Sequence, residues 1–156
     1  MAHDGSAPMT ETPVLPDLLA LTGSSLAPVT QVLVTANDRV RARVSRDGRI
    51  AGDLIEANQT AAHGLAWIAT YVEALRQMHL WAERLESEGK FGETEQLIHQ
   101  IAFGEYLWQI YGGIPMSQGE ILRPQDMGLS QDDQRLMMED AVMRLTQDGN
   151  TEAARM

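Results

Sequence analysis

Apolar residues recur at steps of three and four positions over most of residues 26–148, and this spacing predicts α-helices. The longest predicted helix covers about residues 50–87 and carries two neighbouring apolar stripes. One stripe contains Leu54, Ala61, Leu65, Ile68, Val72, Leu75 and Ala82, and the other contains Trp67, Tyr71, Ala74, Met78, Trp81 and Leu85. An apolar arc this wide is typical of a helix buried against more than one neighbour. We therefore predict an all-α fold, a helical bundle of four or five helices with a long central helix.

Three shorter helices are predicted around the central one, at about residues 25–44, 92–111 and 130–148. The first has Pro28 in its first turn, and the sequence TGSS at residues 22–25 is expected to separate it from an apolar turn at residues 16–21. The second ends where Gly112 and Gly113 follow it. The third begins with Ser130 and Asp133 at the spacing of a capping box.

The same pattern divides the chain into three parts. Residues 1–25 are expected to be a flexible N-terminal segment, residues 26–148 a helical domain, and residues 149–156 a tail or a truncated linker. Inside the domain, residues 112–130 are rich in glycine, proline and polar residues and are expected to form a long ordered loop.

All eight aromatic residues lie between Trp67 and Tyr111, so the core is predicted in this part of the chain. Trp67 and Trp108 are expected to be buried there, one on each of the two central helices. Tryptophan and tyrosine are also enriched at interfaces, which leaves open that part of this set faces another chain.

Composition narrows the classes of function. A length of 156 residues suggests one domain, and the absence of cysteine excludes disulfides and thiolate metal sites. The net charge of −10 argues against non-specific nucleic-acid binding. No uninterrupted apolar run of about 18 residues occurs, so no membrane span is expected. The N-terminus lacks a secretory pattern, so a cytoplasmic location is expected.

Candidate catalytic chemistry is sparse. Paired di-iron sites need Glu-x-x-His motifs, and none is present. Glu95 and His99 are four residues apart and form only a weak candidate for a metal. No nucleophile is recognisable beside a base, and no glycine-rich phosphate loop occurs. We therefore predict no catalytic, cofactor-binding or metal-binding residue in this chain.

Five of the twelve basic residues, Arg39, Arg41, Arg43, Arg46 and Arg49, form an arginine cluster between positions 39 and 49. Two interpretations are open. The arginines could stabilise the C-terminal end of a helix, where cations are favoured. They could instead contact an acidic partner or a nucleotide phosphate.

The predicted helix that ends near Tyr111 is apolar almost all round, and apolar residues continue in the loop after it. Such side chains need cover, and a bundle this small is expected to leave part of them uncovered. We predict an association surface made of Tyr111, Ile114, Met116, Ile121 and Leu122, with Arg41 and Arg43 at its rim.

Two stretches of the chain resemble a known family. They are residues 62–78 (AHGLAWIATYVEALRQM) and residues 88–121 (EGKFGETEQLIHQIAFGEYLWQIYGGIPMSQGEI). Both resemble the extra N-terminal domain of methylsuccinyl-CoA dehydrogenase-type enzymes, which are flavin-dependent members of the acyl-CoA dehydrogenase family. The likeness covers about residues 26–130, and it is most specific between residues 91 and 121.

The resemblance implies that the complete enzyme binds FAD and oxidises a branched dicarboxylic acyl-CoA to its enoyl form, in the ethylmalonyl-CoA pathway. The catalytic glutamate and the FAD- and CoA-binding segments of that family belong to a dehydrogenase body that these 156 residues do not contain. The resemblance therefore implies a non-catalytic helical accessory module without a cofactor of its own. Its partner would be a dehydrogenase body or a second copy of the chain, and no nucleic acid or membrane is expected. Two alternatives stay open, a stand-alone interaction or regulatory module and a small ligand-binding bundle.

Overall fold

A computed structural model describes residues 13–117 and 119–156, and it is mostly helical. The α-helices are α1 (Leu18–Arg43), α2 (Gly52–Ala57), α3 (Gln59–Ser87), α4 (Glu93–Gly112), α5 (Asp140–Gln147) and α6 (Glu152–Arg155), and the 3₁₀ helices are η1 (Pro124–Met127) and η2 (Asp133–Met138). Strands β1 (Ser45–Arg46) and β2 (Arg49–Ile50) pair antiparallel, as do β3 (Ile114–Ser117) and β4 (Glu120–Leu122). The predicted helical class is confirmed at this level, while the two small sheets depart from an all-α fold.

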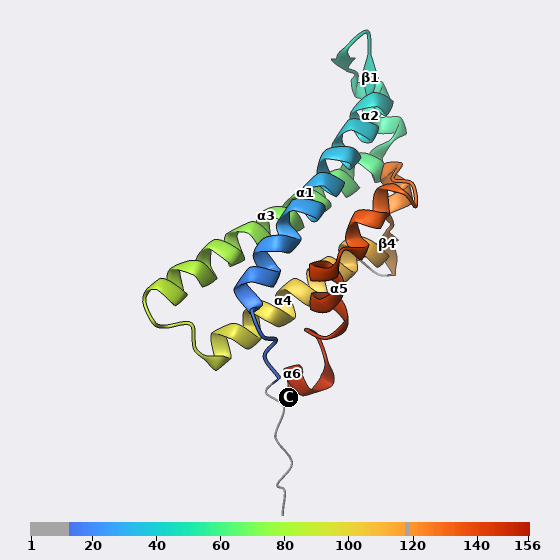
Figure 1. The fold of residues 1–156 in the computed structure, drawn as a ribbon. Coiled ribbons are helices and arrows are strands. Elements are labelled where there is room, and N and C mark those ends of the chain that lie inside the picture. Colours follow the sequence, from blue (N-terminus) through green and yellow to red (C-terminus); the bar gives the residue numbers. More distant parts are fainter. Residues whose placement is uncertain (1–12, 118) are drawn as a thin grey trace, which may run out of the picture.

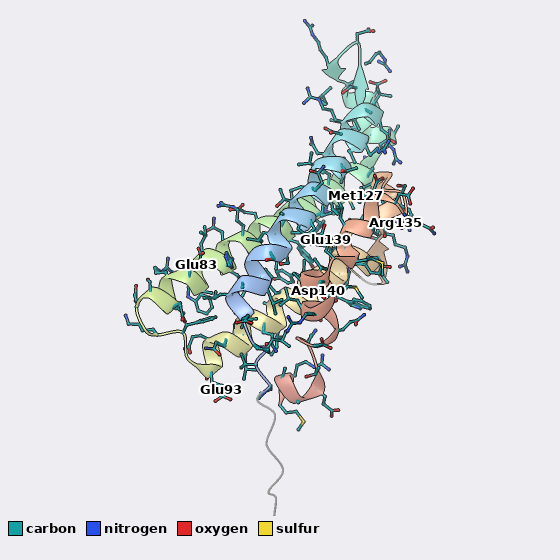
Figure 2. All side chains as sticks on the ribbon, in the orientation of Figure 1. Glu83, Glu93, Met127, Arg135, Glu139 and Asp140 are labelled. Atoms are coloured by element: carbon teal, nitrogen blue, oxygen red, sulfur yellow. The ribbon has the colours of Figure 1, made fainter. Side chains whose placement is uncertain are left out.

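The long helices α1 and α3 lie side by side, and α4 packs across them (Figure 1). The end that contains β1 and α2 projects beyond the other elements, whereas α5 packs on α1 and α4. The core between these helices contains Val29, Val32, Ala36, Ile68, Leu75, Phe103, Leu107 and Leu145, each at most 1% exposed. Acidic side chains such as Glu83 and Glu93 lie on the exposed surface near the α3–α4 turn (Figure 2).

Helix α1 is longer than predicted, and the expected break at residues 22–25 is wrong. The helix begins at Leu18 and continues through Gly23 and Pro28. Leu18 and Leu21 are buried, and the Ser25 hydroxyl donates a hydrogen bond of 2.8 Å to the Thr22 carbonyl. Burial of the first turns therefore outweighs the local preference of this sequence for a turn. Of the segment expected to be flexible, residues 13–25 are ordered, and residues 1–12 lie outside the described part.

By length and composition alone, α1 could cross a membrane, although a buried core helix passes the same test. Val29, Val32, Ala36 and Val40 of α1 are at most 2% exposed. Packing in the protein core thus accounts for much of its apolar character.

The central helix was predicted as one element over residues 50–87, but two helices occupy this stretch. Helix α2 has no buried residue and ends at Ala57, and the side-chain amide of the following Asn58 donates to the Leu54 carbonyl. Helix α3 then runs for 29 residues. The long central helix is therefore real, and its first turns are replaced by a short exposed helix.

The stretch predicted as a loop contains the β3–β4 hairpin. Ile114 pairs with Leu122 and Pro115 with Ile121, with an irregularity between Pro115 and Ser117. Ile114 and Leu122 point into the core and are each 2% exposed. The apolar positions of the supposed loop thus bury one face of a hairpin.

The last predicted helix, at residues 130–148, is interrupted. Ser130 and Asp133 do form reciprocal hydrogen bonds, as their spacing predicts. The following element is the 3₁₀ helix η2, and Glu139 is extended (ψ 148°) before α5 begins. The reciprocal hydrogen bonds are present, but they stabilise a turn before η2, whose N-cap is Asp132, so the prediction of a single helix that starts at Ser130 is wrong.

The prediction that Trp108 is buried is also wrong. Its side chain is 52% exposed, and Trp67 is only partly buried. Phe103, on the opposite face of α4, is fully buried instead. Helical spacing locates an apolar stripe, but it does not say which of two apolar faces meets the core.

Candidate functional site

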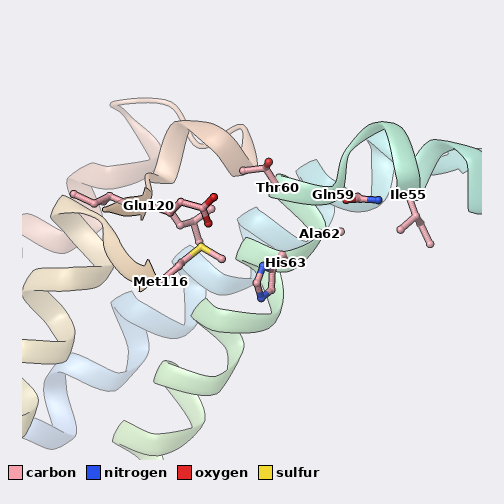
Figure 3. A pocket seen from close by; sticks show the side chains of 9 residues that line it. Ile55, Gln59, Thr60, Ala62, His63, Met116 and Glu120 are labelled. Carbon is pink, nitrogen blue, oxygen red and sulfur yellow. The ribbon is translucent and has the colours of Figure 1, made fainter. Parts of the chain in front are cut away.

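A groove of about 580 Å³ lies between the first turns of α3 and the β3–β4 hairpin. Its walls are Ile55 of α2, Gln59, Thr60, Ala62 and His63 at the start of α3, and Met116, Glu120, Ile121 and Leu122 of the hairpin. Figure 3 shows His63 and Met116 on opposite sides of this space, with Ile55 farther along. The groove is therefore open and partly apolar.

Two glycines allow the hairpin to sit this close to α3. A Cβ atom on Gly64 would lie 2.5 Å from Cδ1 of Leu122, so α3 accepts the Leu122 side chain only where it lacks a side chain of its own. Gly113 has φ +132°, which other residues rarely adopt, and a Cβ there would lie 2.5 Å from Cγ2 of Ile121. The sequence Gly112–Gly113 therefore does more than end a helix, because it directs the hairpin against α3.

The polar groups of the groove do not form a catalytic set. The Trp67 indole N–H donates a 2.9 Å hydrogen bond to Nε2 of His63. Among residues 13–117 and 119–156, no group of three or more histidine, aspartate or glutamate side chains could hold a metal ion. The groove thus combines the apolar side chains of Ile55, Met116 and Ile121 with the polar ones of His63 and Glu120.

The structure separates the residues of the predicted association surface. Ile114 and Leu122 are core residues, so this hairpin covers its own apolar positions and needs no partner for them. Met116 is half-buried and Ile121 is 48% exposed, and both line the groove. Tyr111 is partly buried and lies at the end of α4, where its ring centroid is 6.0 Å from that of Trp108.

Three of the five clustered arginines bind within the chain. Nη1 of Arg43 donates a 2.8 Å hydrogen bond to the Asp126 carbonyl, Arg46 pairs with Asp53 at 2.7 Å, and Arg39 lies 3.8 Å from Asp133. Arg41 is exposed and makes no hydrogen bond or ion pair with any described residue. Arg39 and Arg43 thus connect the end of α1 to η2 and η1, and Arg46 connects β1 to α2, which supports a structural role for these three arginines.

A buried polar junction, which the sequence did not reveal, joins α1, α3 and α4. Oγ1 of Thr22 lies 3.0 Å from Nδ1 of His79 and 3.1 Å from Nε2 of His99. The Thr22 hydroxyl also donates to the Leu19 carbonyl, so we assign both imidazole nitrogens as donors to its oxygen. His99 then keeps a lone pair on Nδ1, which is buried and has no hydrogen-bond partner.

The surroundings of this junction keep His99 neutral. Its ring is 0% exposed, and ring centroids of Phe91 and Phe103 lie 5.7 and 4.7 Å away. Burial, and secondarily the charge of His79, lowers the pKa of His99 from 6.5 to about 4. Gly23 belongs to the same arrangement, because a Cβ there would lie 3.2 Å from the His79 ring. Thr22 and His99 are fully buried and the His79 side chain is 13% exposed, and together they connect α1, α3 and α4.

A second buried polar residue, Gln100, fixes both ends of the described chain. Its side-chain amide donates to the carbonyls of Pro13 and Gly149, each at 2.9 Å, and its carbonyl accepts from the backbone N–H of Leu15 at 2.7 Å. A glutamine in an apolar helix gave no signal of this role in the sequence. The expected tail at residues 149–156 is thus attached at its first residue.

Neighbouring side chains and burial shift the pKa values of Glu73 and Tyr71. Hydrogen bonds from Arg76 and then Gln77 lower the pKa of Glu73 to about 2. Burial, followed by the nearby Tyr106 and Glu105, raises the pKa of Tyr71. Tyr71 donates a 2.8 Å hydrogen bond to Gln109 and stacks on Tyr106 with centroids 4.6 Å apart. These contacts fasten α3 to α4.

Comparison with known proteins supports the resemblance found in the sequence. No protein-family model matches the chain. The chain is 53% identical over 147 residues to (2S)-methylsuccinyl-CoA dehydrogenase of Cereibacter sphaeroides. This match covers 94% of the chain but 26% of that protein, so the chain corresponds to a segment of about a quarter of its length. The resemblance to methylsuccinyl-CoA dehydrogenase-type sequences is thereby confirmed.

Proposed function

We propose that this chain is a non-catalytic helical assembly module that packs against the body of an acyl-CoA dehydrogenase of the methylsuccinyl-CoA type. The observation that carries the proposal is the 53% identity over 94% of the chain to a segment of a methylsuccinyl-CoA dehydrogenase. Identity this extensive over one folded unit supports a similar structure and similar neighbours in the assembled enzyme.

The geometry supports a binding role rather than a catalytic one. Thr22 and His99 of the histidine junction are buried, and the open groove presents Met116 and Ile121 beside isolated polar groups. In this proposal, flavin and acyl-CoA bind to the dehydrogenase body, and the module contributes an apolar contact surface. The isolated chain is then expected to retain no flavin and to leave acyl-CoA substrates unoxidised.

The groove also favours a second candidate function, a ligand-binding helical bundle. About 580 Å³ can accept a small molecule, and His63 and Glu120 could supply polar contacts to it. This function would require no dehydrogenase body. Binding of acyl-CoA or its acyl group to the isolated chain, measured by calorimetry, separates the two candidates.

The assembly proposal is tested by reconstitution. The part of the C. sphaeroides dehydrogenase outside the matched segment is co-expressed with this chain as a separate polypeptide. Flavin absorbance reports whether that body is folded, and light scattering during gel filtration gives the mass of any complex. We expect a stable complex at equal stoichiometry. A folded flavin-containing body that elutes separately from this chain at micromolar concentration would contradict the proposal.

A further inference from the structure

Helix α4 is apolar on the face that it turns away from the core. Its inner face buries Phe103, Leu107 and Ile110. On its outer face, Ile98 is 54% exposed and Trp108 is 52% exposed. Ile101, between them on the same face, is only partly buried. A helix that packs on one side normally presents polar residues on the other, so this helix has an apolar face without cover from the described chain.

The exposed face continues beyond the end of α4. The Trp108 ring lies against that of Tyr111, with centroids 6.0 Å apart. Tyr111 and Met138 of η2, which is 54% exposed, line a shallow hollow together with the polar side chains of Gln125, Gln131, Gln134 and Arg135. We call Ile98, Ile101, Trp108, Tyr111 and Met138 the α4 face. Ile98 and Trp108 are ten residues apart, about 15 Å along the helix axis, so the face is an extended strip rather than a single side chain.

The carboxylate of Glu105, on this face, accepts hydrogen bonds from neighbouring side chains. Glu105 lies between Ile98 and Trp108 on α4, and its carboxylate accepts from the amide of Gln109 at 2.6 Å and from that of Asn150 at 2.9 Å. A partner that covers Trp108 would therefore meet a carboxylate that already has two donors. The desolvation cost of such a group is smaller than that of a free charge.

Two other exposed apolar side chains, Val34 of α1 and Leu80 of α3, differ from the α4 face. Val34 and Leu80 are 45% and 44% exposed, and each is surrounded on its helix by exposed polar residues. Single exposed apolar side chains of this kind are common and need no partner. The α4 face combines several apolar residues with a tryptophan, the residue type most enriched among those that dominate interface energies.

We propose that the α4 face is the surface on which the dehydrogenase body docks, an inference that rests on the proposed function. The occupant follows from the comparison. The matched segment makes up 26% of the C. sphaeroides protein, so about three quarters of that chain is covalently attached to the same helical unit. In that protein a large neighbour is joined to the unit, and its contact with the uncovered apolar strip on α4 would remove apolar area from water.

The experiment uses the reconstituted complex and compares exposed positions of similar accessibility. Trp108→Ala and Ile98→Ser change the α4 face, Leu80→Ser changes an isolated apolar position on α3, and Ile121→Ser changes the groove. Thermal melting of each variant confirms that it is folded. The dissociation constant for the flavin-containing body is measured by calorimetry. We expect Trp108→Ala to weaken binding by about tenfold or more. Ile98→Ser should weaken it less, and the other two variants should bind like the parent.

Each result of this experiment supports or overturns the proposed docking surface. Parental affinity in both α4 variants would overturn the α4 face while leaving the assembly function intact, and a loss confined to Ile121→Ser would move the docking surface to the groove. Equal weakening by Leu80→Ser and Trp108→Ala would also overturn the inference, because the effect would then reflect general hydrophobicity. Failure of the parent chain to bind a folded body would remove the assembly function itself.

Discussion

Acidification should weaken the junction between α1, α3 and α4, because His99 is held there in its neutral form. Burial and the neighbouring His79 lower the pKa of His99 from 6.5 to about 4. The unfolded chain therefore takes up a proton near pH 6.5, whereas the folded chain does so only near pH 4. The stability contributed by the neutral ring is fully present above the unfolded pKa and is lost as the pH falls from about 6.5 toward 4.

The size of this effect follows from the two pKa values. At pH 5 the unfolded imidazole is almost fully protonated, while the folded one is still largely neutral. Linkage then gives a loss of about 2 kcal/mol in the free energy of unfolding between pH 7 and pH 5 from His99 alone. A loss of that size is a considerable part of the stability of an ordinary domain.

Urea unfolding of the full chain at pH 7 and pH 5 measures this loss. The variant His99→Gln cannot titrate in this range and keeps an amide that can donate to Thr22, so its loss on acidification should be about 2 kcal/mol smaller than that of the parent. The control is His63→Gln, which removes an exposed histidine and should behave like the parent. His79 and Glu83, 3.5 Å apart beside the junction, are unchanged in all three proteins. Equal losses in the parent and in His99→Gln would refute the reasoning.

Three further predictions concern stability near neutral pH, each measured by urea unfolding. Gly104→Ala should cost about 1–3 kcal/mol, because the new Cβ would lie 2.6 Å from the Leu145 carbonyl oxygen. The control is Gly112→Ala, which should cost little because nothing lies within 4 Å of its Cβ position. Similar costs for both variants would contradict the packing argument. Gln100→Ala should cost about 1–3 kcal/mol by leaving buried backbone groups unpaired, and an unchanged midpoint would show that water replaces the amide. Trp108→Ala should cost less than the roughly 3–5 kcal/mol expected for a buried tryptophan, because the ring is half exposed, and a loss in that range would mean that it is buried.

Several features were determined by the sequence itself. Helical spacing located the central helix and the bounds of α4, since Gly112 and Gly113 end that helix for local reasons of backbone conformation. The hydrogen bonds between Ser130 and Asp133 join residues three positions apart, so the sequence could predict them. The family resemblance was also present in the sequence, in residues 62–78 and 88–121, and the identity to a dehydrogenase segment confirms it.

Other features were decided only by tertiary contacts. The expected break at residues 22–25 does not occur, because Leu21 and Ser25 are buried and Gly23 admits the His79 ring. The hairpin after α4 was hidden in a stretch rich in glycine and proline, and it forms where Gly64 of α3 accepts Leu122. Neither event could be read from local spacing, since each depends on a residue far away in the sequence.

For the surface of α4, too, the sequence determined one property and the tertiary structure another. Periodicity showed that α4 is apolar almost all round, which is a property of its sequence. Packing placed Phe103 in the core and left Trp108 at the surface, because α1, α3 and α5 cover α4 while the described chain leaves Ile98 and Trp108 half exposed. The sequence shows how apolar each position is. The fold determines which of these apolar positions are covered by other parts of the chain.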